Sequence, residues 1–287
     1  MGRYDPTAQY EVAKVEVVYR HDGDTSWPAT VYQPQGDGPF PALLHVHGGA
    51  WNTGNPNSSD IVHTALAATG LVIVGIQLRT APERTHPAQT LDTNYGVRWL
   101  KAHAADFNAT AEHVGLTVSS SGGQPAMMSS MRPTDQQYAA LPLPEAPDND
   151  ASVAYVIAMW PVLDPYVRYL YAKRVGKERV VSNTTTYFLT EEVMEKQNPQ
   201  YLLDKGDVTH LPPLLVLQGD ADENIPNEIP ERFEKSYKAA DGHIELEWFP
   251  GMPHQFLWHE GSETDRAIAL AKAFIARQLA ESRAVSS

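Results

Sequence analysis

The chain has 287 residues, of which 42% are hydrophobic and 20% are charged, so the composition predicts a packed core and excludes a disordered chain. The formal net charge is −13, and an acidic chain repels phosphate backbones and anionic lipid, which argues against nucleic acid and membrane surfaces as partners. There is no cysteine, which excludes disulfides, thiolate metal sites and cysteine nucleophiles.

The N-terminal residues lack the basic and then apolar pattern of a secretory signal. No stretch is apolar over the length that is needed to cross a bilayer. Because there is no cysteine, nothing in the chain calls for an oxidising compartment. We therefore expect a soluble, cytoplasmic protein.

The predicted elements begin with strands. Residues 12–20 alternate apolar and polar side chains, and residues 28–34 follow a turn, which together predict a hairpin. Later runs are short and apolar on both faces, as a buried parallel sheet requires. These runs are residues 41–49, 71–77, 113–118, 153–160 and 212–219.

Helical patterns alternate with these runs. They cover residues 60–70, 90–107, 229–242 and 263–282, and the last of them carries a continuous apolar stripe. Strands that alternate with helices in this way are typical of a mostly parallel sheet with helices on both faces. The sequence therefore predicts the α/β class.

Two stretches interrupt the alternation. Residues 132–152 are rich in proline and predict an irregular surface excursion. Residues 161–203 form a long insertion between two core strands, rich in tyrosine and basic residues, which we interpret as a lid. Its basic run, residues 173–179, could meet an acidic substrate, but we interpret it as a solvated helix face. Because core-like strands continue after both stretches, we predict a single domain over residues 1–287.

Three consecutive serines follow the apolar run at residues 113–118 and precede two glycines. A strand, a tight turn that bears serine and then small residues opening a helix are the context of a nucleophile elbow. The turn can be centred on Ser120 or on Ser121. Sterically the Ser121 frame fits better, because the Ser120 frame places the bulky Val118 where glycine is usual. The residues alone leave both serines open.

A serine nucleophile needs a base and a group that orients the base. Asp220 and Asp222 follow the buried run at residues 212–219, and His254 follows a later strand in a loop with glycine and proline. The order serine, acid, histidine is the one that accompanies the nucleophile elbow. Residues 45–54 add glycines after a core strand, where the main chain can approach a substrate carbonyl and stabilise an oxyanion.

Taken together, the chain resembles the α/β-hydrolase superfamily over nearly its whole length. It is similar to the esterase/lipase group, with its hormone-sensitive-lipase-like, acetyl-esterase-like and kynurenine-formamidase-like members. The segments that carry the resemblance occur in the group's order. They are residues 38–51, 77–92, 96–123, 198–226 and 249–256.

The resemblance implies the α/β-hydrolase fold and assigns the site residues. The nucleophile lies two residues before the first glycine of the pair, which is Ser120. The acid becomes Asp222, with Asp220 as a loop former, and the base becomes His254 rather than His243 or His259. The implied oxyanion groups are the backbone N–H groups of Gly48, Gly49, Ala50 and Ser121. The chain departs from the group at Val118 and Pro125, which we expect to alter packing rather than to abolish activity.

The implied activity is that of a carboxylesterase, which cleaves esters of small to medium size through an acyl-enzyme and needs no cofactor. Two alternatives remain open. One is an amide hydrolase, such as an arylformamidase or a peptidase, with the same triad. The other is a non-catalytic ligand-binding relative. Dimers are common in the resembling families, so a homodimer is also expected.

Two further sets of residues invite an interpretation. His45 and His47 point to one face of a strand, but without a third histidine or a carboxylate cluster we predict no metal site and expect His47 to hold the oxyanion segment. Aromatic residues in and near the insertion could line the substrate pocket or pack the lid. Of Trp51, Trp160, Tyr166, Tyr169, Tyr187 and Phe188, we predict that Trp51, Trp160, Tyr187 and Phe188 bind substrate.

Overall fold

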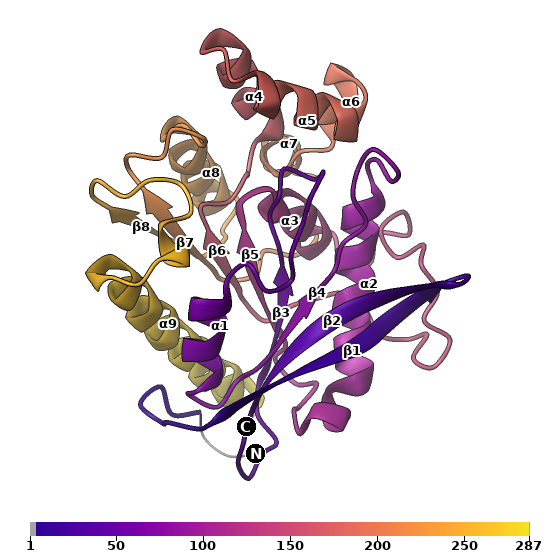
Figure 1. Cartoon of the computed structure of the whole chain (residues 1–287), viewed down its shortest axis with the longest axis vertical. Helices are drawn as coiled ribbons and strands as arrows, with labels where there is room; N and C mark the ends of the chain where they lie inside the picture. The colour runs from indigo at the N-terminus through magenta and orange to yellow at the C-terminus, as the bar shows by residue number, and fades with distance from the viewer. Residues whose placement is uncertain (1–3, 287) are drawn as a thin grey trace.

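An eight-stranded sheet forms the centre of the computed structural model, which describes residues 4–286 (Figure 1). The strands are β1 (Val12–Asp22), β2 (Thr25–Pro34), β3 (Ala42–Val46), β4 (Val72–Ile76), β5 (Gly115–Ser119), β6 (Val156–Met159), β7 (Leu214–Gly219) and β8 (Ile244–Phe249). They lie in the order β1-β2-β4-β3-β5-β6-β7-β8. The pairs β1–β2 and β2–β4 are antiparallel, and every later neighbouring pair is parallel. The predicted mostly parallel sheet is confirmed.

Helices connect the strands of the parallel part. They are α1 (Asp60–Ala67), α2 (Ala88–His103), α3 (Gly123–Met131), α4 (Pro165–Arg174), α5 (Glu178–Phe188), α6 (Glu191–Lys196), α7 (Pro199–Lys205), α8 (Glu228–Ala239) and α9 (Ser262–Ser286). Three short 3-10 turns are η1 (Ala104–Phe107), η2 (Ser120–Gly122) and η3 (Phe256–Trp258). The single helix predicted over residues 90–107 is observed as α2, which is followed directly by the 3-10 turn η1.

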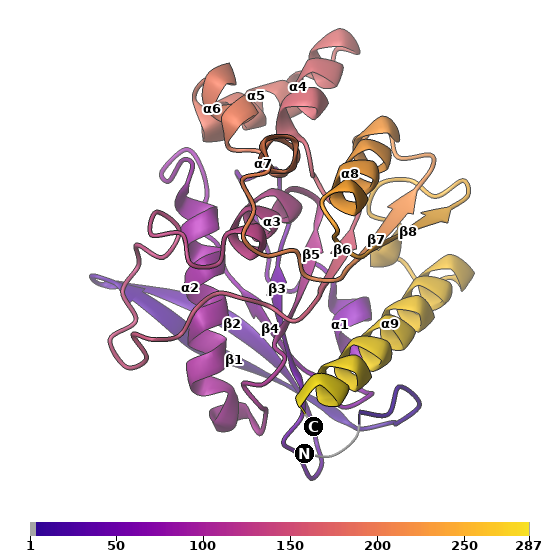
Figure 2. The ribbon, with the colours of Figure 1, turned by 180° about the vertical axis from the view of Figure 1, so that it is seen from behind.

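The helices cover both faces of the sheet (Figures 1 and 2). Alternate residues of the buried strands therefore enter different cores. Leu43 of β3 belongs to the core that contains α1 and α9, whereas Leu44 belongs to the core that contains α2, α3 and α8. Each such leucine contributes about 1.5–3 kcal/mol of hydrophobic stabilisation when it is fully buried.

The insertion between β6 and β7 folds into helices α4–α7, which lie together at one end of the molecule, beyond the carboxyl ends of the parallel strands (Figure 1). Asp164 caps α4 by accepting a hydrogen bond from the Val167 N–H, and Asn198 caps α7. The Asn198 side chain also donates to the Asp164 carboxylate at 2.7 Å. One hydrogen bond thus joins the first and last helices of the insertion near their starts.

Residues 132–155, between α3 and β6, contain no helix or strand in the described chain. This stretch includes the predicted excursion over residues 132–152. Arg98 of α2 donates to the Leu141 carbonyl at 2.7 Å, and Lys101 donates to the Asp150 carboxylate at 2.8 Å. The excursion is therefore fastened along α2.

Candidate active site

Ser120 occupies a strained turn between β5 and α3. Its φ is +49°, a backbone conformation that costs a residue with a side chain on the order of 1–3 kcal/mol. The surroundings require small neighbours: a Cβ at Gly122 would meet the backbone carbonyls of Val46 and His47, and a Cβ at Gly48 would lie 2.8 Å from the Ser120 Cβ. The strand, turn and helix therefore have the form that a nucleophile elbow needs.

Three side chains from distant parts of the chain form a chain of hydrogen bonds. The Ser120 Oγ lies 3.0 Å from the His254 Nε2, and the His254 Nδ1 lies 2.7 Å from the Asp222 Oδ2. Among the described residues the histidine bonds to Ser120 and not to Ser121. Ser120 follows β5, Asp222 follows β7 and His254 follows β8, so all three meet at the carboxyl end of the sheet, where open α/β sheets bind their ligands.

The Asp222 carboxylate is fully buried and fully hydrogen-bonded. Its Oδ1 accepts from the backbone N–H groups of Asn224 and Ile225 at 2.7 and 2.9 Å, and its Oδ2 also accepts from the Gln218 amide at 3.0 Å. Burial raises the pKa of Asp222, but the hydrogen bond and charge of His254 and the two backbone N–H groups outweigh it, so the pKa lies below its ordinary value of 3.8. An ionised Asp222 accepts from the His254 Nδ1–H, which leaves Nε2 as the acceptor toward the Ser120 hydroxyl.

The neighbouring Asp220 has a different task. Its carboxylate accepts from the Gly251 N–H at 2.6 Å, and its carbonyl accepts from the Asn227 amide at 3.2 Å. It therefore fastens the loop that carries Asp222 to the loop that carries His254, as expected of a loop former. The rival histidines lie elsewhere: His243 contacts Glu245 at 3.2 Å, and the His259 carbonyl accepts from Thr264.

The segment after β3 turns sharply beside Ser120. Gly49, Ala50 and Trp51 all have positive φ, of +116°, +52° and +61°. Gly49 and Ala50 line a pocket together with Ser120, and their backbone N–H groups donate no hydrogen bond within the described chain. Ser121 is the second residue of η2, in the first turn of a helical segment, where a backbone N–H has no partner within the helix. These three groups could donate to an oxyanion.

Gly48 differs from the other predicted oxyanion groups. Its N–H donates to the Ser119 Oγ at 3.1 Å, so it is used within the protein. The sequence pattern could not separate Gly48 from Gly49, because both follow the same strand and only the path of the main chain decides which N–H faces the pocket.

His47 holds this segment in place. Its Nδ1 lies 2.7 Å from the Gly48 carbonyl oxygen, and its Nε2 accepts from the Leu78 N–H at 3.2 Å. Burial lowers the pKa of His47 to about 4, so the ring is neutral and Nδ1 carries the proton that it donates. The expected hydrogen bond from His47 to the segment after β3 is present.

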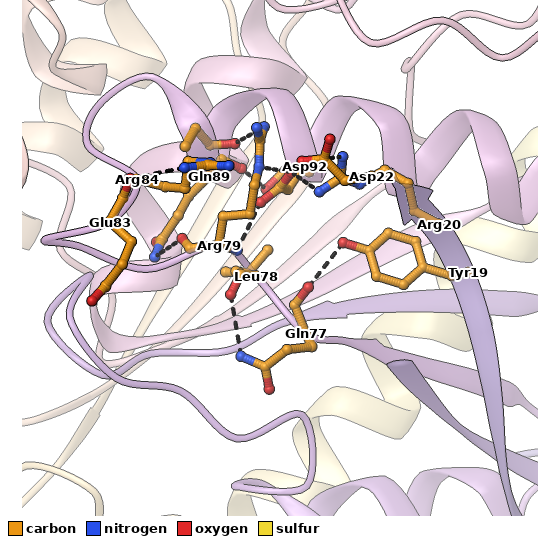
Figure 3. A network of polar contacts seen from close by, with 12 residues as sticks. Tyr19, Arg20, Asp22, Gln77, Leu78, Arg79, Glu83, Arg84, Gln89 and Asp92 are labelled. Atoms are coloured by element: carbon orange, nitrogen blue, oxygen red, sulfur yellow. Dashed lines mark hydrogen bonds and ion pairs between the residues drawn. The ribbon is translucent and has the colours of Figure 1, made fainter. Parts of the chain in front are cut away.

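A buried polar network supports the same segment from α2 (Figure 3). The Gln89 amide donates to the carbonyls of Trp51 and Arg79 at 3.2 and 3.0 Å. Arg79 in turn binds the buried Asp92 through its backbone N–H at 2.8 Å and its Nε at 2.7 Å, and Arg20 lies 3.5 Å from the same carboxylate. Gln89 and Asp92 were not predicted from the sequence, although both lie in residues 77–92, one of the segments that carry the resemblance.

The pocket beside Ser120 has a volume of about 450 Å³, within the usual range of small-molecule sites. It is lined by Gly49, Ala50, Thr53, Ser120, Arg168, Arg179, Val180, Asn183, Asn224, His254, Gln255 and Trp258. An adjoining cavity of about 530 Å³ shares four of these residues, Arg179, Val180, Asn224 and His254. The lining combines polar and apolar surface, and of its residues the sequence pointed to the turn after β3, Ser120, His254 and, within the basic run 173–179, Arg179.

The four aromatic residues predicted to bind substrate do not line this pocket. Trp51 stacks on Tyr187 with ring centroids 5.6 Å apart, and Phe188 packs edge-on against both. All three are fully buried, and Trp160 is buried against His254 and Phe256. Trp51, Tyr187 and Phe188 pack the core between the segment after β3 and the end of α5, whereas Trp160 packs in the core on the other face of the sheet.

The described residues contain no group of three or more histidine, cysteine, aspartate or glutamate side chains that could hold a metal ion. His45 instead packs edge-on against His63 at 4.2 Å, and burial lowers the pKa of both rings. Within residues 4–286 no helix is long and apolar enough to cross a membrane.

Comparisons with known proteins agree with this geometry. The family model described as BD-FAE matches residues 29–237. Esterase LipC of Mycobacterium tuberculosis is 30% identical over 258 residues, which are 86% of this chain and 60% of that protein. An acetyl-hydrolase of Streptomyces hygroscopicus is 27% identical over 81% of this chain and 74% of its own length. The chain spans about half to three fifths of the length of the first three curated relatives it matches.

Solved structures share the fold. The thermophilic esterase 2 of Thermogutta terrifontis, in a butyrate-bound structure, superposes with a TM-score of 0.71 over 94% of each chain, at 21% identity. At this identity the likeness establishes the arrangement of the elements. The type of reaction must be inferred from the geometry of the site in this chain.

Proposed function

The chain belongs to the BD-FAE family and has the α/β-hydrolase fold, and on this premise we propose that it is a carboxylesterase. The proposed substrates are carboxylic esters of small to medium size, in keeping with a pocket of about 450 Å³ beside Ser120. The observation that carries the proposal is the hydrogen-bonded chain from Ser120 through His254 to the ionised Asp222. The names of the relatives, which are esterases and an acetyl-hydrolase, support it.

In the proposed acylation, the Ser120 Oγ attacks the ester carbonyl carbon while the His254 Nε2 accepts the hydroxyl proton. Asp222 holds the imidazole in the required tautomer and stabilises its charged form. The carbonyl oxygen becomes an oxyanion, which accepts hydrogen bonds from the backbone N–H groups of Gly49 or Ala50 and of Ser121. When the tetrahedral intermediate collapses, the bond to the alcohol oxygen breaks and His254 returns the proton to it.

Deacylation repeats these steps with water. The His254 Nε2 accepts a proton from a water molecule, whose oxygen attacks the acyl carbon on Ser120. The second tetrahedral intermediate releases the carboxylic acid and returns the proton to the Ser120 Oγ. All proton transfers use groups of the chain itself.

We also propose the finer points that the sequence raised. Residues 1–287 act as one domain, and residues 161–203 act as its lid. The contribution of Arg179, Val180 and Asn183 of α5 to the pocket lining supports the second point. A homodimer is proposed from the resemblance, and a cytoplasmic location from the absence of cysteine.

Labelling with a fluorophosphonate, followed by peptide mapping, tests the proposal. We expect an adduct on Ser120 that is absent in Ser120→Ala and His254→Ala and retained in Ser129→Ala, where the replaced serine is buried in α3. An adduct on Ser121 would overturn the assignment of the nucleophile. A folded protein without an adduct would favour the non-catalytic relative.

A matched pair of an anilide and a phenyl ester with the same acyl group separates ester from amide chemistry. The proposed esterase cleaves the phenyl ester and leaves the anilide nearly untouched. Faster cleavage of the anilide would favour the amide hydrolase.

A further inference from the structure

The charges around the pocket beside Ser120 are unbalanced. Two guanidinium groups, those of Arg168 and Arg179, belong to its lining, and no aspartate or glutamate does. The whole chain has a formal net charge of −13, so the charge of this lining is opposite in sign to that of the protein. A water-excluded wall of one sign concentrates its field on a ligand of the opposite sign.

Arg168 is a buried cation with an unused donor. It is 1% exposed, and its Nε and Nη2 both donate to the Asn224 Oδ1, at 3.1 and 2.6 Å. Its Nη1 is buried without a hydrogen-bond partner, and it forms no ion pair within residues 4–286. Burial lowers the pKa of Arg168 to about 10, and the charge of Asp222 acts in the opposite direction, so the group is charged at neutral pH.

Burial of a cation without a paired anion is costly, and proteins usually provide a partner. Asp222 is the carboxylate whose charge reaches Arg168, but it is hydrogen-bonded to His254 and to backbone N–H groups instead. The Arg168 guanidinium also lies over the Trp51 ring, 5.8 Å from its centroid, but no anion within residues 4–286 pairs with it, so a ligand anion can do so.

Arg179 supplies direct donors at the same pocket. It lies on α5, is exposed, and has no ion pair or hydrogen bond in the described part of the chain. The adjoining cavity differs, because Glu178 and Glu223 belong to its lining and Lys177 lies 3.7 Å from Glu223. The pocket that contains Ser120 has two guanidinium groups and no carboxylate in its lining.

We propose that the ester substrate carries a carboxylate group, which Arg179 binds directly and Arg168 attracts from the pocket wall. This inference rests on the proposed carboxylesterase function and specifies its substrate class. A guanidinium matches the two oxygens of a carboxylate in a planar, bidentate pair that lysine cannot form. The proposal also revises the interpretation of residues 173–179 as a solvated face: Arg179, the last of them, faces the pocket.

Matched esters measure the preference. Monoethyl adipate and ethyl hexanoate differ by one carboxylate in the acyl part, and γ-acetoxybutyrate and butyl acetate differ by one carboxylate in the alcohol part. In at least one pair at low salt, we expect kcat/KM for the ester that carries a carboxylate to exceed that for its uncharged partner by about tenfold or more. Charge-assisted hydrogen bonds are strong enough for such a difference. The preference should weaken with added salt.

Substitutions of the two arginines test whether they cause the preference for a carboxylate. Arg179→Gln, at an exposed position, and Arg168→Met should each lower the ratio of the two kcat/KM values by about fivefold or more, mainly through KM. Arg168→Lys should retain part of the ratio, because the charge remains. The control is Arg174→Gln, an exposed arginine of α4 outside both cavities, which should leave the ratio unchanged.

A binding measurement separates this inference from the proposed function. Calorimetric titration with adipate and with its neutral match adipamide requires no turnover, and we expect adipate alone to bind and Arg179→Gln to weaken it. Cleavage of the neutral esters without a carboxylate preference would overturn the inference and leave the esterase function standing. A preference that persists in both Arg179→Gln and Arg168→Met would also overturn it. Adipate binding without cleavage of any ester would instead overturn the function and keep the subsite.

Discussion

The backbone N–H of Gly48 donates to the Ser119 hydroxyl at 3.1 Å, and so joins the segment after β3 to the residue directly before the Ser120 turn. Two strands that pair in the sheet are thereby linked again at their carboxyl ends. The β3–β5 ladder ends at the pair Val46 and Val118, so we expect this link to set how closely Gly49 approaches the Ser120 Oγ.

Ser119→Ala should lower kcat by about tenfold with little change in KM, since small displacements of an oxyanion group affect the transition state more than the ground state. Steady-state kinetics on an uncharged ester checks this. Ser129→Ala is the control, because the Ser129 hydroxyl is buried without a partner in the described chain and its loss removes no hydrogen bond. Equal effects of the two substitutions would contradict the proposed role of the link.

Gln89→Ala should reduce both stability and kcat. The lost amide leaves the buried carbonyls of Trp51 and Arg79 without these hydrogen bonds, at a cost of about 1–3 kcal/mol. Urea unfolding and kinetics measure the two effects. The matched control is Gln33→Ala, which removes a similar bond to the Phe107 carbonyl far from the site and should affect stability alone.

Asp222→Asn should lower kcat by about four orders of magnitude, the loss seen when the orienting acid of such a triad is replaced by an amide. It should also change the dependence of stability on pH. Because the pKa of Asp222 is lowered in the folded protein, its stabilisation is present above the ordinary value of 3.8 and is lost as the pH falls through the folded value.

The difference in unfolding free energy between wild type and Asp222→Asn should therefore shrink as the pH falls from about 5 to about 3. Urea unfolding at several pH values gives this difference. A difference that stays constant over the range would count against an ionised, hydrogen-bonded Asp222.

Buried histidines should destabilise the protein in mild acid. Burial lowers the pKa of His47 to about 4 and that of His63 to about 3, from 6.5. Below pH 6.5 the unfolded chain binds protons that the folded chain excludes, so stability is complete above 6.5 and is lost as the pH falls toward the folded values. In His63→Phe, the unfolding free energy from denaturant titrations should fall less steeply as the pH is lowered below 6.5. An unchanged slope of unfolding free energy against pH would contradict this prediction.

Local motifs made much of the site predictable. The acid and histidine segments are short stretches after strands, and their order along the chain is visible in the sequence. The size of Val118 favoured the Ser121 frame, but Val118 does not crowd the turn that brings Ser120 to His254. Val118 lies in the core that contains α2 and α3, and the close approach to β3 occurs at Gly122 instead.

The pocket lining was not predictable in the same way. Whether an aromatic ring lines a cavity or packs a core depends on its partners, and Trp51 meets Tyr187 across more than a hundred residues of chain. Arg168 reaches the pocket because Asn224, 56 residues later, accepts two of its hydrogen bonds. Such contacts form only when the insertion helices dock on the sheet, and no local pattern encodes them.

The Asn52 amide donates to the Ala50 carbonyl at 2.6 Å and to the Asn183 carbonyl of α5 at 2.9 Å. The same helix that shapes the pocket is thus hydrogen-bonded to the segment proposed to bind the oxyanion. Exchange of α5 for the corresponding helix of a relative would alter substrate choice and turnover together. A redesign of the proposed substrate range would have to keep the position of Asn183 and change the side chains around it.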